Sequence, residues 1–250
     1  MRAGLLAALL AFVAVTGADA ACRQALALGL DVSGSVDARE YRLQLGGLAQ
    51  ALDSPAVRAA LLEQPEMPVD LMIFEWSGPQ DQLTLVPWTR IASPMALDGV
   101  IEGLAAVERR ADSTPGTALG VAMLHGARML AQRESCLRRT LDISGDGKSN
   151  LGPRPRNVKQ QIEGRGITIN ALVIGADDPS AGDARQNEIA ELSAYFAAEV
   201  ILGPEAFIEV ALGFEGYAEA MEVKLLRELD GLVLSMRQDL RSDNGVTLRE

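Results

Sequence analysis

Short apolar runs that alternate with helical patterns constrain this chain more than any other feature. ALALGL (25–30) is bounded by turn signals and is typical of a strand buried on both faces. Similar runs follow at VDLMIFEW (69–76), RRTLDIS (138–144) and ITINALVIG (167–175). Because helical patterns lie between them, the sequence predicts a doubly wound α/β fold, with a mainly parallel sheet and helices on both faces.

Several further elements complete this prediction. LTLVPW (83–88) follows VDLMIFEW after the turn SGPQDQ, which predicts a hairpin with an antiparallel edge strand. A short strand is expected at 200–202. Apolar residues at helical spacing predict a long C-terminal helix, and its apolar face would consist of Phe214, Met221, Leu225, Leu229 and Leu232. Other helices are expected after the Ser/Asp turn that follows ALALGL, over 95–110, from 119, over 157–165 and over 183–198.

The first residues have the pattern of a secretion signal. Arg2 is followed by an apolar stretch and by the small residues Ala18–Ala20 at a cleavage position. The sequence therefore predicts a signal peptide over 1–20, one domain over 21–241, a flexible tail over 242–250 and a periplasmic or secreted mature protein. A lipid anchor at Cys22 is the alternative, although Asp19 stands where such signals usually carry an aliphatic residue.

Length and charge limit the class of partner. The 250 residues are 48% hydrophobic, which suffices for one large core. The formal net charge of −11 argues against nucleic acid or an anionic membrane surface as the main partner, because both repel an acidic protein. No stretch after the signal is long and apolar enough to predict stable membrane insertion.

The two cysteines have matching positions. Cys22 lies nine residues before Asp31, and Cys136 lies ten before Asp146. If both aspartates end neighbouring parallel strands, both cysteines lie at the opposite edge of the sheet. In an oxidising compartment this placement predicts a disulfide, with two unpaired thiols as the alternative.

Oxygen-bearing side chains gather where the functional crevice of such a sheet is expected, at the carboxyl ends of the strands. Asp31, Ser33 and Ser35 follow the first strand, Thr117 lies in STPGTALG before a helix, and Asp146 lies in SGDGKSN. None of the five offers sulfur or imidazole. Such a set suits a hard divalent cation, Mg²⁺ first, with Mn²⁺ or Ca²⁺ as alternatives.

In this D-x-S-x-S…T…D set the sequence resembles the von Willebrand factor A (VWA) domain family and its metal-ion-dependent adhesion site (MIDAS). The resemblance covers nearly all of the mature chain, including the order of strands and helices. It implies a Rossmann-like VWA fold, direct binding of the ion by Ser33 and Ser35, and direct or water-mediated binding by the aspartates. Thr117 would change its coordination between states. FEWSGPQ and EAMEVKLLREL (219–229) resemble an exported bacterial branch of unknown function.

Two alternatives compete for individual residues of this set. Thr114 competes with Thr117 for the threonine position, and the spacing to the following helix favours Thr117. Ser35 or Asp37 is also suited to cap a helix that begins near Val36. Capping accounts for one of these residues but not for the whole set.

The function expected from these residues is binding without catalysis: an acidic group of a protein partner would be held through the cation. His125 is the only histidine and has no evident nucleophile partner, which disfavours serine-hydrolase chemistry. A magnesium-dependent phosphohydrolase with a strand-end aspartate is the enzyme alternative, although Ser33 stands where a second aspartate is usual. A structural subunit of an envelope complex is the third hypothesis.

Two charged features need a structural explanation. Asp142 lies within a strand that should be central, so its carboxylate must be paired, hydrogen-bonded or near the end of the sheet. Arg154, Arg156 and Lys159 form a basic run just past Asp146. This run either attracts an acidic partner or belongs to a solvated loop.

Overall fold

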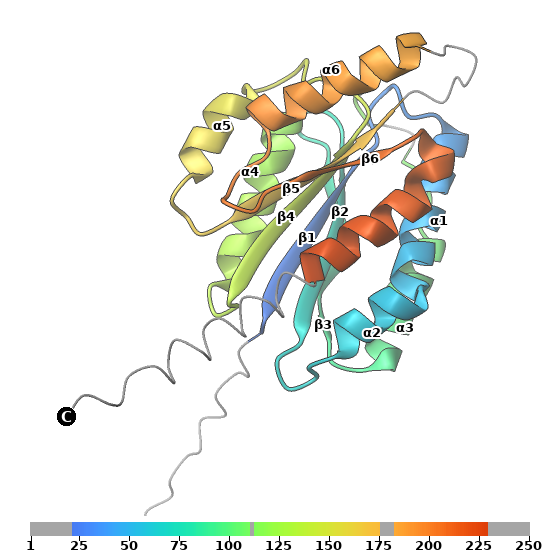
Figure 1. Ribbon diagram of the computed structural model, residues 1–250, viewed down its shortest axis with the longest axis vertical. Coiled ribbons are helices and arrows are strands. Elements are labelled where there is room, and N and C mark those ends of the chain that lie inside the picture. The colour runs from blue at the N-terminus through green and yellow to red at the C-terminus, as the bar shows by residue number, and fades with distance from the viewer. Residues whose placement is uncertain (1–21, 111–112, 176–182, 230–250) are drawn as a thin grey trace, which may run out of the picture.

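One six-stranded sheet is present in the computed structural model, which describes residues 22–110, 113–175 and 183–229 (Figure 1). The order across the sheet is β3-β2-β1-β4-β5-β6, with only the β2–β3 pair antiparallel. The predicted doubly wound fold with one hairpin edge is thereby confirmed. The strands are β1 Gln24–Asp31, β2 Val69–Trp76, β3 Gln82–Ile91, β4 Arg138–Gly145, β5 Thr168–Ile174 and β6 Ile208–Ala211.

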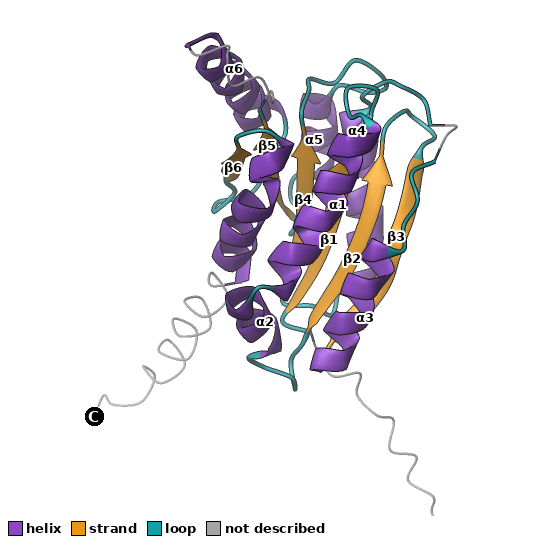
Figure 2. Ribbon diagram, turned by 90° about the vertical axis from the view of Figure 1, so that its right-hand side faces the viewer, coloured by secondary structure: helices purple, strands orange, loops and turns teal. Residues whose placement is uncertain are grey.

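Helices cover both faces of this sheet. One face carries α1 Ala38–Asp53, α2 Pro55–Leu62, α3 Pro94–Ala105 and a helix over 217–229, and Figure 2 looks onto the part covered by α1 and α3. The other face carries α4 Leu119–Leu130, α5 Pro155–Ile162 and α6 Asp183–Glu199. Short 3₁₀ helices lie at Ala131–Arg133 and Phe214–Gly216. No helix in the described ranges combines the length and apolarity required to cross a membrane.

The central strand β1 shows why the sheet forms here. Its leucines Leu26, Leu28 and Leu30 pack into the core beneath α1, and Ala25 and Ala27 pack into the core beneath α4. All eight of its residues are buried, so both faces of the strand must be apolar. Each fully buried leucine contributes roughly 1.5–3 kcal/mol.

The edge strand β3 is irregular. Its pairing with β2 shifts register between Leu71 and Ile73 and again between Ile73 and Phe74. Pro87 lies within it, and its side chains are largely exposed or half-buried. Strand irregularity and proline are tolerated at an edge because no further ladder has to form there.

Some element boundaries differ from the sequence-based expectation. The prediction of a strand at 200–202 is wrong. Val200 and Ile201 donate their N–H groups to the Phe196 carbonyl at the end of α6, and Leu202 makes only an isolated bridge to Ile169. The last strand is Ile208–Ala211 instead. The separate helix α2, which begins after the Ser54 cap, was not predicted.

The C-terminal helix is described over 217–229, and the remainder of the expected long helix lies outside the described residues, as do the expected signal peptide and tail. This helix carries the partner of Asp142. The buried Lys224 ammonium lies 2.8 Å from the Asp142 carboxylate and 2.7 Å from Glu228. Asn170 donates to Glu228 over 2.7 Å. Burial raises the pKa of Asp142 to about 7, with Lys224 opposing the rise and Glu228 adding to it.

The predicted disulfide is present. Cys22 and Cys136 immediately precede the β1–β4 pair, and their Cα atoms lie 4.5 Å apart. A sulfur in this bond cannot also carry a lipid, so the lipid-anchor alternative conflicts with the structure. Asp70 lies close to both sulfurs, but its carboxylate pairs with Arg90 and Arg133. Both sulfurs are bonded to each other, so neither is a thiolate that could bind a metal. This group is therefore not a metal site.

Candidate metal centre

Asp31 ends β1 with its side chain fully buried between neighbouring strands. Its Oδ1 accepts a hydrogen bond from the Ser33 backbone N–H at 2.8 Å. Its Oδ2 has no hydrogen-bond partner. The chain at the end of β4 approaches this second oxygen, because a Cβ placed on Gly145 would lie 3.4 Å from it. Asp31 thus directs one unsatisfied carboxylate oxygen toward the carboxyl end of the neighbouring strand.

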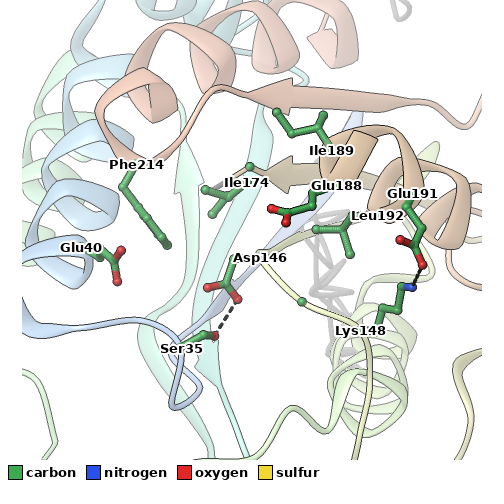
Figure 3. A pocket seen from close by; sticks show the side chains of 12 residues that line it. Ser35, Glu40, Asp146, Lys148, Ile174, Glu188, Ile189, Glu191, Leu192 and Phe214 are labelled. Atoms are coloured by element: carbon green, nitrogen blue, oxygen red, sulfur yellow. Dashed lines mark hydrogen bonds and ion pairs between the residues drawn. The ribbon is translucent and has the colours of Figure 1, made fainter. Parts of the chain in front are cut away.

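Ser33, Ser35 and Asp146 form a hydrogen-bonded series beside Asp31. The two serine hydroxyls lie 3.2 Å apart, and Ser35 Oγ donates to Asp146 Oδ1 over 2.8 Å (Figure 3). Asp146 directly follows β4, which pairs in parallel with β1. The loops that follow β1 and β4 are therefore in contact, as expected.

Thr117 lies in a loop that contacts the loop of the two serines. Gly34 N–H donates to the Pro115 carbonyl over 3.1 Å, and a Cβ on Gly34 would come within 2.7 Å of that carbonyl oxygen. Thr117 is buried, and Asn150 holds its backbone at both the N–H (2.9 Å) and the carbonyl (3.0 Å). The threonine segment is therefore fixed beside the serine turn.

Thr114, the competing threonine, is placed differently. It is exposed, and its backbone N–H donates to Asp81 over 3.0 Å, next to Gly78 in the β2–β3 turn. Its surroundings are thus those of the hairpin rather than of the serine turn.

The cap of α1 is Asp37. Its carboxylate accepts the N–H groups of Arg39 and Glu40, and the Glu40 side chain accepts the Asp37 N–H in return, which completes a capping box. The two serines are therefore not used for capping. The capping alternative accounts for Asp37 only.

Both carboxylates of the cluster are costly to ionise. Burial first, and then the nearby charge of Asp146, raise the pKa of Asp31 to about 8, against the hydrogen bonds from Ser33. Burial also raises the pKa of Asp146, against the hydrogen bond from Ser35. Ionised oxygens and hydroxyls without nitrogen or sulfur are the donor set of a hard cation, so the residues present fit a divalent ion.

Other residues singled out in the sequence have structural roles. The basic run packs α5 against α6, because Arg154 and Arg156 both pair with Glu199 (3.3 and 2.9 Å) and Lys159 donates to the Ala198 carbonyl. His125 packs against Phe74 with ring centroids 4.9 Å apart. Neither feature belongs to the Asp31 cluster.

Two supporting residues escaped sequence reasoning. Gln44 of α1 is buried and donates to the Asp31 carbonyl over 2.8 Å, which fixes the end of β1. Asn150 positions Thr117 as described. The position of Gln44, next to Leu45 on the apolar face of α1, indicates in the sequence that this side chain makes a buried polar contact. It does not indicate that the acceptor is the Asp31 carbonyl.

The serine turn separates two hollows. One, of about 450 Å³, opens beside Ser35 and Asp146 (Figure 3). The other, of about 360 Å³, lies beside Ser33 and Gly34 and is bordered by Arg109 and Arg110. The candidate metal centre therefore lies at an accessible surface and has space on both sides for a larger ligand.

Comparison with known sequences gives a family without a described function. The family model described as "Protein of unknown function (DUF1194)" matches residues 21–233. No curated protein sequence matches the chain.

Several solved structures have the same fold. The mussel byssus protein PTMP1, in a structure with a zinc-occupied MIDAS motif, has a TM-score of 0.56 at 16% identity over 84% of this chain and 48% of its own. The pilus adhesin SpaC of Lactobacillus rhamnosus GG scores 0.57 at 14% identity over 85% and 30%. A von Willebrand factor type A protein of Catenulispora acidiphila scores 0.55 at 15% identity over 83% and 43%. The chain spans less than half the length of each, and at these identities the likeness concerns the fold alone.

Proposed function

We propose a function from the premise that this chain belongs to the family described as protein of unknown function DUF1194 and has the VWA fold. The protein is a periplasmic or secreted binding module that holds a divalent cation at the carboxyl edge of its sheet and thereby binds an acidic group of a protein partner. The residues that hold the ion are Asp31, Ser33, Ser35, Thr117 and Asp146.

One observation carries this proposal: the buried, unpartnered Oδ2 of Asp31 beside a second carboxylate. A buried carboxylate with one unpartnered oxygen is costly to ionise in a protein interior, and the pKa of Asp31 is raised to about 8 accordingly. The Ser33 and Ser35 hydroxyls and Asp146 surround the same position with further oxygen donors. A divalent cation satisfies the orphaned oxygen and offsets both negative charges.

The chemistry of the donor set favours some divalent cations over others. Two carboxylates and three hydroxyls favour Mg²⁺ or Mn²⁺, and the small number of carboxylates disfavours tight Ca²⁺ binding. When bound, the ion supplies a positive charge that an acidic side chain from outside can meet. The zinc-occupied MIDAS of PTMP1 is a property of that protein, and it supports a divalent cation in this fold.

The surroundings of the site favour a protein as partner. Leu151, which packs beside Gly116, is 38% exposed, and Leu212, which follows β6, is 64% exposed. Both lie in loops at the same edge of the sheet as the serine turn. Exposed apolar side chains beside a charged centre are typical of protein interfaces.

Catalysis is not part of the proposal. A phosphohydrolase of the rival type needs its strand-end aspartate in contact with the substrate, whereas Asp31 is 0% exposed. Turnover of phosphate esters with Mg²⁺ that is lost in Asp31→Asn would overturn the binding function. Capture of envelope proteins that is unaffected by chelator would favour the structural-subunit hypothesis instead.

Thermal unfolding with and without metal tests the proposal. The parent chain is expected to melt at a higher temperature as Mg²⁺ or Mn²⁺ is added, because an ion that binds only the folded state stabilises it. Asp31→Asn should abolish that increase while leaving the metal-free melting temperature about equal, because the raised pKa of Asp31, about 8, already keeps its carboxyl neutral near pH 7 and asparagine keeps its shape. Asp37→Asn is the matched control, because asparagine also caps helices and the site is untouched.

Two results would contradict the proposal. One is a parent chain whose melting temperature does not respond to either metal. The other is an equal metal response in the parent and in Asp31→Asn.

A further inference from the structure

Trp76, the last residue of β2, has a buried polar atom that lacks a partner beside the candidate metal centre. Its side chain is 0% exposed, and its indole Nε1–H has no hydrogen-bond acceptor in the described part of the chain. Burial of a donor without an acceptor is costly. The indole N–H only donates and cannot bind a cation, so it requires an acceptor such as an oxygen.

Strand pairing places this indole beside Asp31. The two residues are paired across the parallel strands β1 and β2, so their side chains leave the same face of the sheet. Both side chains also reach Gly145 at the end of β4, where a Cβ would lie 3.8 Å from the Trp76 ring and 3.4 Å from Asp31 Oδ2. Because β1 lies between β2 and β4, the ring extends across β1 toward the unpartnered oxygen of Asp31.

The core that receives the ring is apolar. It includes Phe74, Leu119 and Phe196, and the Phe196 ring would lie 3.1 Å from the same Cβ on Gly145. The acceptor that strand pairing brings to this core is the Asp31 carboxylate.

The backbone at the end of β2 is fixed to the same centre. The Trp76 carbonyl accepts the N–H of Val32, which lies within the D-x-S-x-S turn, over 2.9 Å. The Ser77 carbonyl accepts the N–H of Ala118, directly after Thr117, over 2.7 Å. The strand that carries the indole is therefore bonded to both loops that carry proposed hydroxyl ligands.

We propose that the Trp76 indole N–H is the outer hydrogen-bond donor of the metal centre and supports the Asp31 carboxylate at Oδ2, directly or across one water. This inference rests on the proposed function. Carboxylates that bind a metal are themselves held by hydrogen bonds, and these outer partners orient the carboxylate and strengthen metal binding. Trp76 is thus a positioning residue and not a ligand.

Nuclear magnetic resonance of the otherwise unaltered site tests the inference. The chain has two tryptophans, so ¹⁵N labelling of this residue type gives two indole N–H signals, and Trp88→Phe assigns them. Added Mg²⁺ should shift the Trp76 indole proton downfield, because a hydrogen bond to an ionised carboxylate is shorter and stronger than one to a neutral group. Asp31→Asn should abolish this shift.

Trp88 is the matched control within the same spectrum. Its Nε1 is also buried without a hydrogen-bond partner among the residues that the structure describes, but its ring lies against Arg133, just past the end of α4. Since α4 begins beside Thr117, that end lies away from the metal centre. The Trp88 signal should therefore stay in place when Mg²⁺ is added.

Two variants separate the hydrogen bond from packing. Trp76→Phe removes the donor, so the affinity for Mg²⁺, obtained by titration of the melting temperature, should fall by about tenfold or more. Phe74→Leu alters a ring that is equally buried in the same core but has no polar atom. It should lower the melting temperature and keep the metal affinity of the parent.

The possible failures are distinguishable. An unchanged Trp76 signal in a parent chain whose melting temperature rises with Mg²⁺ would overturn the inference and leave the proposed function standing. An equal shift of the Trp88 signal, or an equal loss of metal affinity in Phe74→Leu, would do the same. If Trp76→Phe does not fold, the spectrum of the parent decides. A parent that responds to Mg²⁺ in neither measurement would overturn both.

Discussion

Ser35 and Asp146, which lie 111 positions apart in the chain, share a hydrogen bond of 2.8 Å. The bond follows from the sheet, because β1 and β4 are parallel neighbours and the loops after them emerge at the same edge. It joins the turn that carries the two serines to the turn that carries the second aspartate.

The two threonines are expected to differ in their effect on metal binding. Thr117→Val keeps the size of the side chain and removes the hydroxyl. We expect its metal affinity to fall by about tenfold or more, which reduces the metal-induced thermal shift. Thr114→Val, beside the hairpin turn, should leave the shift unchanged. A titration of melting temperature against Mn²⁺ measures both, and a stronger effect from Thr114→Val would transfer the proposed ligand role to Thr114.

Gly34 is expected to be intolerant of any side chain. A Cβ there would lie 2.7 Å from the Pro115 oxygen, so Gly34→Ala must push the serine turn from the threonine loop. We expect a loss of about 1–3 kcal/mol in the free energy of unfolding and weaker metal binding. Gly46→Ala is the control: that position in α1 has open space, and alanine should stabilise the helix by about 0.5–1 kcal/mol. Equal effects from the two variants would contradict the close contact of the loops.

The buried cluster of Asp142, Lys224 and Glu228 predicts a pH dependence of stability. The raised pKa of Asp142, about 7, means that the native state keeps a proton that the unfolded chain releases near its ordinary value of 3.8. The contribution of this group is therefore complete below about pH 4 and is lost as the pH rises toward 7, with a slope approaching 1.4 kcal/mol per pH unit.

Asp142→Asn should remove that slope. Urea unfolding of parent and variant between pH 4 and 8 measures it, and the difference between the two curves reports Asp142 together with its coupling to Lys224 and Glu228. Parallel curves would show that this carboxyl is not the one that holds the proton.

The disulfide is expected to contribute strongly to stability. It links residues separated by 114 positions, and the chain-entropy model gives about 4–5 kcal/mol for a loop of this length. Urea unfolding with and without reductant should show this difference in the parent. The Cys22→Ala/Cys136→Ala double variant should be insensitive to reductant, and a parent that loses less than about 1 kcal/mol would contradict the estimate.

The sheet and the candidate centre were largely predictable because each depends on local patterns that topology then combines. Buried strands are continuous apolar runs, and the carboxyl ends of parallel strands meet at one edge of the sheet. The residues that follow these strands can therefore be predicted to be neighbours even when the helix packing is unknown. Asp31, Ser35 and Asp146 are brought together in this way. The pairing of Cys22 and Cys136 follows from the same argument at the opposite edge.

The remaining features depend on tertiary contacts that no local pattern specifies. Lys224 and Glu228 have the spacing of an ordinary surface ion pair, yet both are buried because Asp142 lies opposite them. Only the need of Asp142 for a partner indicated this cluster. The strand Ile208–Ala211 is four residues long, and its half-buried pattern is too short to distinguish from loop.

The irregular strand β3 also affects how this protein can meet another chain. An edge strand with Pro87 and two register shifts presents no continuous row of donors and acceptors, so a foreign strand cannot extend the sheet on that side. The opposite edge, β6, offers only four residues to such an addition. Recognition by main-chain pairing is thereby disfavoured at both borders, so the selectivity of the proposed binding function would depend on the side chains that the loops present.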